Sequence, residues 1–386
     1  MNGDLKDKTL GEIEQIASAM GQKRYAAGYI FSFVHSKGCE DVSQISPLSK
    51  AFRSELAGQG YFISRLDIVK KLTDADGTVK YTFGLAPLEI ARPRRGPPPT
   101  PLEIPPPPGP PPTTREFLTG LADGGRIESV LLFDGRRKTL CVSTQAGCAM
   151  DCAFCATAKV KLRRNLTAGE IVDQVYAVQR DRHRVSNVVY MGMGEPLLNY
   201  EAALKSVRIL NHPAGANIGI RHLTISTCGI APAIRMLADE DLHPRLAISL
   251  NAPTDNLRTG LMPINKRYPI ADVLAAVKEY QLKVKDRVTF EYVMIKGLND
   301  DVAHARLLAR LLSKFISNVN LIEYNPHRGC EFTGSSTEKL ERFAEILEES
   351  GIETTIRFRM GRGISAACGQ LGADWAESQT KGDEKV

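Results

Sequence analysis

Three cysteines stand close together in the sequence, at Cys148, Cys152 and Cys155. Thiolates are the protein ligands of iron–sulfur clusters, and three of them on one short loop can each bind an iron of a [4Fe–4S] cube. The remaining iron then has no protein ligand and is open to a small molecule. A structural zinc site would need a further Cys or His at close spacing, and His183 is too far along the chain to supply it. The spacing therefore favours a [4Fe–4S] cluster over a zinc site or ordinary buried cysteines.

The cysteine content also bears on the cellular compartment. The chain has eight cysteines, and its first ten residues are charged and lack the apolar segment of a secretory signal. In a reducing compartment, metal binding or catalysis explains clustered cysteines better than disulfides do. No stretch approaches about 18 consecutive apolar residues, the length that spans a membrane. We therefore expect a cytoplasmic protein with no membrane span. The formal net charge of +6 fits an RNA partner but is also common in metabolic enzymes.

From about residue 139 onward, strand patterns alternate with helical patterns. Strands are expected at 139–144, 187–192, 223–227, 246–251, 288–295, 319–324 and 354–358. Thr167 and Glu170 have capping-box spacing, and an amphipathic pattern over Ser336–Ser350 ends at Gly351. Repeated βα units predict a parallel sheet with right-handed crossovers. Six such units, rather than the eight of a closed barrel, predict an α/β fold with a partial (β/α)6 barrel.

The chain before residue 115 differs in composition. Thr9 and Glu12 have the spacing of a capping box, which predicts a small helical unit, and the pattern turns strand-like at residues 80–84. Twelve of the 22 prolines fall within residues 93–112, which predicts an extended, solvated loop. We expect an accessory domain at 1–92, a Pro-rich insertion at 93–114, the main domain at 115–372 and a flexible tail at 373–386.

Small and polar residues follow several predicted strands at their carboxyl ends, the functional face of parallel α/β barrels. Gly194 permits close backbone approach, and the neighbouring Glu195 can pair with an ammonium group. Further candidates at the ends of later strands are Ser226, Ser249, Asn251 and Asn325. Each of these residues alone is as typical of a turn as of a ligand contact. Their shared face predicts a binding site.

From about Glu128 to Leu371 the chain resembles the RlmN/Cfr family of radical S-adenosylmethionine (SAM) RNA methyltransferases. The resemblance is carried by CVSTQAGCAMDCAFCATA at 141–158, MGMGEPLLN at 191–199, LMPINKRYP at 261–269, EYVMIKGLND at 291–300 and AACGQL at 366–371. The N-terminal unit resembles, more loosely, that family's RNA-recognition domain. In the superfamily, the open iron chelates SAM, and an electron from the cluster cleaves SAM to a 5′-deoxyadenosyl radical. The resemblance thus implies one [4Fe–4S] cluster and two SAM molecules per turnover.

The resemblance implies roles for individual residues. Cys148, Cys152 and Cys155 would hold the cluster. Cys368 would carry the methyl group, Cys141 would be its resolving partner and Glu128 would be a proton acceptor. The SAM site would be lined by Gly194, Glu195, Ser226, Ser249, Leu250, Asn251 and Asn325.

The chemistry of adenine gives an independent reason for two catalytic cysteines. Ring carbons 2 and 8 lie between electron-withdrawing nitrogens and cannot readily attack the SAM methyl group, whereas a thiolate can. Cys368 would take a methyl group from one SAM, and a second SAM would supply the radical that converts it to a methylene able to join the base. Cys141 would then attack the sulfur of Cys368 and release methylated RNA with a transient disulfide. Without the resemblance, buried structural cysteines remain the simpler interpretation of both.

The chain departs from the family pattern in three places. Asn251 stands where these enzymes usually have His, residues 360–365 lack the acidic residues that often precede AACGQ, and the Pro-rich insertion is foreign to the pattern. RlmN and Cfr differ in methylating carbon 2 or carbon 8 of the same ribosomal adenosine. Residues 194–199 favour carbon 2, whereas 261–269 and 322–326 lean towards carbon 8. We expect carbon 2.

Two other functions fit part of the pattern. Another radical SAM activity, such as glycyl-radical activation, does not need both Cys141 and Cys368, and a non-catalytic Fe–S RNA-binding protein does not need GMGEP.

The resemblance implies 23S ribosomal RNA as substrate, near the peptidyl transferase centre, and tRNA for some members. Candidates for phosphate contacts are Lys159, Lys161, Arg163 and Arg164. We also expect a monomer and an electron-donor protein such as flavodoxin or ferredoxin.

Overall fold

The computed structural model describes residues 3–86, 125–327, 329–357 and 360–375, and a ten-stranded sheet forms its centre. Seven of these strands are parallel and lie side by side in chain order. They are β4 (Arg137–Cys141), β7 (Asn187–Tyr190), β8 (Leu223–Thr227), β9 (Arg245–Ser249), β10 (Val288–Met294), β11 (Ser317–Glu323) and β12 (Glu353–Arg357). In the described part of the chain β12 does not return to pair with the first strand. The prediction of an α/β fold with a partial barrel is confirmed.

Three antiparallel strands extend the sheet beyond β4. They are β1 (Asp67–Thr73), β2 (Val79–Gly84) and β3 (Arg126–Asp134), and β3 pairs directly with β4. The predicted strand at residues 80–84 is therefore present as β2. The whole predicted Pro-rich insertion, residues 93–114, falls between β2 and β3 in the sequence and, like residues 376–386 of the predicted tail, lies outside the described residues.

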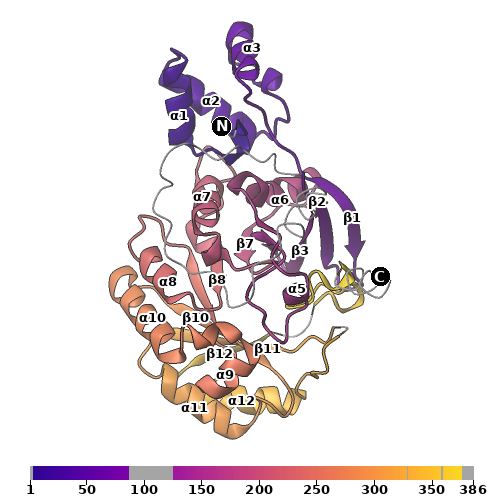
Figure 1. Cartoon of the computed structure of the whole chain (residues 1–386), viewed down its shortest axis with the longest axis vertical. Helices are drawn as coiled ribbons and strands as arrows, with labels where there is room; N and C mark the ends of the chain where they lie inside the picture. The colour runs from indigo at the N-terminus through magenta and orange to yellow at the C-terminus, as the bar shows by residue number, and fades with distance from the viewer. Residues whose placement is uncertain (1–2, 87–124, 328, 358–359, 376–386) are drawn as a thin grey trace, which may run out of the picture.

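Helices connect the parallel strands. They are α6 (Ala168–Arg180), α7 (Tyr200–Asn211), α8 (Ala231–Leu237), α9 (Asp255–Leu261), α10 (Ile270–Val284), α11 (Val302–Leu312) and α12 (Thr337–Glu349). Thr167 and Glu170 form the predicted capping box at α6, and Gly351 takes a left-handed conformation just after α12. Figure 1 shows the helices along the sheet, from α6 and α7 near the N-terminal unit to α11 and α12 at the far end. Among the described residues, no helix is both long and apolar enough to cross a membrane.

The N-terminal helical unit sits at one end of the sheet (Figure 1). Its helices are η1 (Leu5–Asp7), α1 (Leu10–Ala19), α2 (Arg24–His35), η2 (Val42–Gln44) and α3 (Lys50–Gly58). The predicted capping box of Thr9 and Glu12 opens α1. β1, which begins at Asp67, and β2 belong to the main sheet. By sheet topology the helical unit therefore ends before residue 67. The limits that we predicted for the domains stay predictions.

A buried ion pair joins the N-terminal unit to the barrel. Lys6 Nζ lies 2.8 Å from Asp173 Oδ1 on α6, and both side chains are almost fully buried. Asp173 also accepts hydrogen bonds from the amide of Leu66 and from Arg180. Removing one member of a buried pair leaves an uncompensated charge, which costs far more than breaking a surface pair.

We therefore predict that Asp173→Leu lowers the free energy of unfolding by about 3–5 kcal/mol, because Lys6 is left buried without its carboxylate. Chemical denaturation of the purified protein measures this. The matched control is Glu14→Gln, which removes the exposed pair between Glu14 and Arg24 and should leave stability nearly unchanged. Equal effects of the two substitutions would contradict the importance of the buried pair.

Candidate active site

The loop that carries Cys148, Cys152 and Cys155, here called the cluster loop, follows β5 (Gln145–Ala146) and leads into α5 (Ala156–Lys159). β5 pairs with β6 (Arg164–Asn165), which closes the loop at its base. Gly147 opens it with a φ of +81°, and a Cβ at this position would lie 1.8 Å from the carbonyl oxygen of Lys161. Only glycine fits this turn. The structure brings the three thiols within electrostatic range of one another.

The surroundings of these thiols fit iron–sulfur ligands. Burial raises the pKa of Cys148 to about 12 and also raises the pKa values of Cys152 and Cys155. Hydrogen bonds from backbone amides to sulfur oppose this rise in pKa. The amides of the two residues after Cys148 donate to its sulfur, and the amides of Thr157 and Ala158 donate to the sulfur of Cys155. Hydrogen bonds to sulfur are a common feature of iron–sulfur sites. In the described part of the chain no three His, Cys, Asp or Glu side chains converge on one metal ion, and the thiolates of a [4Fe–4S] cube need not do so, since each binds its own iron.

The C-terminal segment, residues 366–372, docks on the cluster loop. The amide of Ala156 donates to the carbonyl oxygen of Gly369 over 2.7 Å, and the hydroxyl of Thr157 donates to the carbonyl oxygen of Leu371 over 2.7 Å. From the other side, the Asn325 side-chain amide donates to the carbonyl oxygen of Cys368 over 3.2 Å. Cys368 is thereby held beside the cluster loop, although more than 200 residues separate them in the sequence.

Cys141 and Cys368 lie within electrostatic range of each other. Cys141 is the last residue of β4 and pairs with Val189 on β7. Burial, the Cys368 thiol and the carboxylate of Glu291 raise the pKa of Cys141 above that of an ordinary thiol. Burial and Glu291 also raise the pKa of Cys368, although this residue is exposed to solvent. Sequence reasoning named both cysteines, and the structure brings them together.

Glu128 lies on β3 and contacts the C-terminal segment at Gly372. Its Oε2 accepts the amide of Gly372 over 2.9 Å, and its Oε1 lies 3.2 Å from Lys80 Nζ on β2. Both side chains are at most 2% exposed. Burial raises the pKa of the Glu128 carboxyl group, and Lys80 opposes that shift. Glu128 thus anchors the segment that carries Cys368, a contact that sequence reasoning did not predict.

The loop after β7 is shaped by glycine and fixed by Glu195. Gly194 has a φ of +96°, and a Cβ there would lie 2.5 Å from the Cβ of Gln145. The buried carboxylate of Glu195 accepts the amides of Leu197 at 3.0 Å and Cys228 at 2.8 Å. Burial raises the pKa of Glu195, and these amides oppose the shift. The carboxylate therefore ties the loops after β7 and β8 together beside the cluster loop.

Polar side chains meet where β8, β9 and β10 lie side by side. Ser226 Oγ donates to Glu291 Oε2 over 3.1 Å and lies 3.4 Å from Ser249 Oγ. Asn325 Oδ1 is buried and has no hydrogen-bond partner among the described residues. Buried polar atoms without partners are rare in proteins, so this oxygen indicates a missing ligand. Hydroxyls, a carboxylate and a free amide oxygen on one face fit the polar groups of SAM.

Two predicted SAM contacts are directed elsewhere. Asn251 has a φ of +59°, a conformation that asparagine tolerates well, and its side chain accepts the amide of Val293 and donates to Met262 Sδ. The side chain of Leu250 is fully buried, and its carbonyl oxygen accepts a hydrogen bond from Arg258. The replacement of the family's His by Asn251 therefore coincides with a side chain that stabilises the neighbouring strand.

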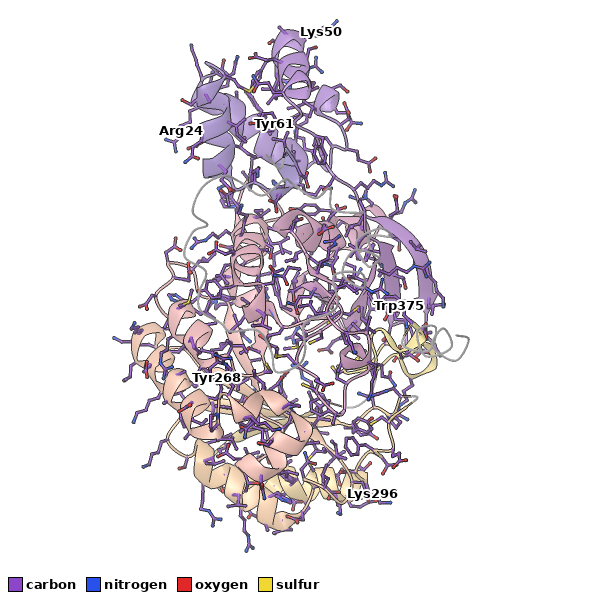
Figure 2. All side chains as sticks on the ribbon, viewed as in Figure 1. Arg24, Lys50, Tyr61, Tyr268, Lys296 and Trp375 are labelled. Atoms are coloured by element: carbon purple, nitrogen blue, oxygen red, sulfur yellow. The ribbon has the colours of Figure 1, made fainter. Side chains whose placement is uncertain are left out.

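Acidic side chains contact the segment at 360–365 from the turn between β1 and β2. Asp76 accepts the amide of Gly361 over 2.7 Å, and Asp74 accepts the amide of Gly363 over 3.0 Å. Figure 2 shows Trp375, near the end of the described chain, beside these first strands.

Among the basic residues beyond the cluster loop, Lys159 and Lys161 are exposed. Arg164 is buried and forms a forked pair with Glu170, which makes our expectation of a phosphate contact there wrong.

Sequence reasoning missed three residues of the site, namely Lys80, Arg258 and Glu291. Glu291 stands between Phe290 and Tyr292 in a strand whose other residues are apolar or β-branched, and a charge in such a run is a detectable signal. Lys80 and Arg258 carry no such signal, because in the sequence a basic residue in an amphipathic strand or helix is expected to face solvent.

Comparisons with known proteins agree with this geometry. Residues 142–308 match the family described as the radical SAM superfamily, and residues 3–61 match the ribosomal RNA large subunit methyltransferase N-terminal domain. A crystal structure of a radical SAM methyltransferase from Sphaerobacter thermophilus is 40% identical and superposes with a TM-score of 0.80, covering 96% of this chain and 99% of that one. The fold and the cysteine motif thus define a radical SAM protein.

Curated relatives that match nearly the whole chain specify the family. A probable dual-specificity RNA methyltransferase RlmN from Symbiobacterium thermophilum is 42% identical over 95% of this chain and 90% of its own length. The dual-specificity RNA methyltransferase RlmN from Syntrophobacter fumaroxidans is 39% identical over 96% of this chain and 98% of its own length. The chain belongs to the RlmN family.

We predict that anaerobically reconstituted protein binds about four irons per chain. Changing Cys148, Cys152 or Cys155 to Ala should abolish the visible absorbance of the cluster, because each thiolate binds one iron. Cys330→Ala is the matched control, since Cys330 contacts the carbonyl oxygen of Ala153 in the same loop and is outside the ligand set. Iron analysis and absorbance measure both. A full cluster in all three Ala variants would contradict the ligand assignment.

Proposed function

We propose that this protein transfers a methyl group from SAM to carbon 2 of an adenosine in 23S ribosomal RNA, and to tRNA as a second substrate. The observation that carries the proposal is the placement of Cys368 beside both the cluster loop and Cys141. Neither glycyl-radical activation nor non-catalytic RNA binding requires such a pair. The N-terminal match to a ribosomal RNA methyltransferase domain and the names of the relatives support RNA as the substrate.

Cys148, Cys152 and Cys155 would hold a [4Fe–4S] cluster, and the polar face made by Ser226, Ser249, Glu291 and Asn325 would take SAM. When bound and reduced by an electron-donor protein such as flavodoxin or ferredoxin, the cluster supplies the electron that cleaves SAM to a hydrogen-abstracting radical. The protein's contribution is to position the reacting groups and to exclude water. The partly buried thiols of Cys141, Cys148 and Cys152, which pack against the apolar core, are suited to that task.

Cys368 would act as the first methyl acceptor. Its thiolate attacks the SAM methyl group, and a carbon–sulfur bond forms as S-adenosylhomocysteine leaves. Burial and Glu291 disfavour negative charge on Cys368, so conversion of its thiolate to a neutral thioether is favoured in this environment. Loss of one hydrogen atom from the methyl group then leaves a methylene radical that can add to the adenine ring.

Cys141 and Glu128 would complete the reaction. After the methylene carbon joins the ring, the ring hydrogen leaves as a proton and one electron returns to the reducing system. Glu128 is the proposed proton acceptor; its raised pKa suits a group that must hold a proton. The Cys141 thiolate attacks the Cys368 sulfur, the carbon–sulfur bond breaks, and the carbon leaves with the electron pair and takes up a proton. An external reductant then reduces the disulfide.

The resolving role of Cys141 can be tested by trapping. Cys141→Ala should accumulate a protein–RNA conjugate linked through Cys368, because methylation and radical addition proceed but release does not. Denaturing gel electrophoresis with labelled RNA detects the conjugate. Cys39→Ala, at a buried cysteine of the N-terminal unit, should turn over normally, and the double variant Cys141→Ala, Cys368→Ala should form no conjugate. Normal turnover by Cys141→Ala would mean that Cys141 is only a strand residue.

The product defines the position of methylation. We expect 2-methyladenosine in RNA treated with the loaded enzyme and SAM, because the chain belongs to the RlmN family and carries the 194–199 motif. Nucleoside mass spectrometry against both synthetic isomers makes the distinction, and RNA from cells with and without the protein gives the same comparison in vivo. Finding 8-methyladenosine alone would place the protein with Cfr.

A further inference from the structure

Arg258 is a buried cation without a carboxylate partner. The residue lies on α9 and is fully buried at 0% exposure. Within the described residues, no Asp or Glu oxygen lies within the 4.0 Å of an ion pair with its guanidinium. Asp255 interacts with Arg258 electrostatically, but its Oδ1 already accepts hydrogen bonds from Asn265 and from the amide of Ile270. Charges in protein interiors are normally paired, so Arg258 calls for an anionic neighbour.

The guanidinium of Arg258 is fixed by neutral acceptors. Nε donates to the carbonyl oxygen of Leu250 over 3.1 Å, and Nη1 donates to Asn265 Oδ1 over 2.8 Å and to the carbonyl oxygen of Tyr268 over 3.3 Å. Nη2 donates to the carbonyl oxygen of Cys228. Figure 2 labels Tyr268, which marks this region in the molecule. These bonds hold the charge in place after β8 and β9, but none of the four acceptors neutralises it.

The cluster loop lies next to this charge. The amide of Ala153, between two of the proposed ligands, donates to the carbonyl oxygen of Leu261 at the end of α9 over 2.9 Å. Arg258 is within electrostatic range of Cys152 and Cys228, and it opposes the effect of burial on the thiol of Cys152. Three thiolates outweigh the positive charge of an oxidised [4Fe–4S] core, so the ligated cluster is an anion, and one-electron reduction makes it more negative.

We propose that Arg258 is the counter-charge of the [4Fe–4S] cluster and a positioning residue that favours its reduction. A fixed cation stabilises the reduced cluster more than the oxidised one, because the reduced cluster carries one more negative charge. In a buried site this interaction is weakly screened by salt. The inference rests on the proposed iron–sulfur function but not on the identity of the methylated base.

The test is a redox titration of the reconstituted cluster, in which electron paramagnetic resonance measures the reduced fraction. SAM is left out because the charge of its sulfonium would add to that of Arg258. Arg258→Gln keeps hydrogen-bond donors and removes the charge. We expect its reduction equilibrium to be at least about tenfold less favourable than in the wild type, a potential about 59 mV lower for a one-electron couple. Arg258→Lys keeps the charge and loses the fork, and its equilibrium should stay within about threefold of the wild type.

Two further variants make the test decisive. Arg235→Gln removes an exposed arginine that pairs with Glu279 on the protein surface and should leave the potential unchanged. Asn265→Asp leaves Arg258 intact and places a carboxylate beside Nη1, so at pH 8 it should lower the potential in the same direction as Arg258→Gln. If Arg258→Gln does not load with iron, retention of iron in Arg258→Lys still separates loss of the charge from loss of the side chain.

The outcomes separate the alternatives. Iron loss from the Gln and Asp variants with retention in Arg258→Lys would also support the counter-charge. Three results would overturn the proposal and leave Arg258 a structural residue. They are unchanged potentials in loaded Arg258→Gln and Asn265→Asp, equal shifts in Arg258→Lys and Arg258→Gln, and iron loss from all three of these variants. Wild-type protein that binds no iron would contradict the proposed function instead.

Discussion

The hydrogen bonds between the C-terminal segment and the cluster loop are the contacts on which the rest of the site depends. They join residues 366–372 to α5, while Glu128 and Asn325 hold the same segment from β3 and from the end of β11. A hydrogen bond contributes a net stabilisation of about 0.5–1.5 kcal/mol, so these four together favour the docked segment by a few kcal/mol. They help to fix the position of Cys368 relative to Cys141 and to the cluster loop.

The buried charges have two different roles: some join segments of the fold, and one lies beside the cluster loop. The pair of Lys6 and Asp173 and the pair of Lys80 and Glu128 both join segments that are far apart in the sequence, so each fixes a docking geometry more than it adds stability. Arg258 differs because no carboxylate among the described residues contacts its charge, and the anionic cluster would supply the missing partner. In this account, the interior beneath the cluster loop is complete only when the cofactor is bound.

The sequence predicted well what depends on local chemistry. Strand positions and the capping boxes at Thr9 and Thr167 depend on neighbours a few residues away, and they agree with the structure. The extension of the sheet by β1–β3 and the Lys80–Glu128 pair could not be predicted, because a strand pattern does not specify its partner. The contacts of Asn251 with Val293 and Met262 could not be predicted either, because they depend on its left-handed backbone conformation.

The central claim is that the methyl group reaches RNA through Cys368, and isotope labelling tests it most directly. The loaded enzyme is incubated with RNA and SAM whose methyl group carries three deuterium atoms, and the products are analysed by mass spectrometry. The account predicts two deuterium atoms in the methyl group on adenine and the third in 5′-deoxyadenosine, because one is abstracted from the methyl group on Cys368. Retention of all three in the methylated base would show direct transfer from SAM and would contradict the account.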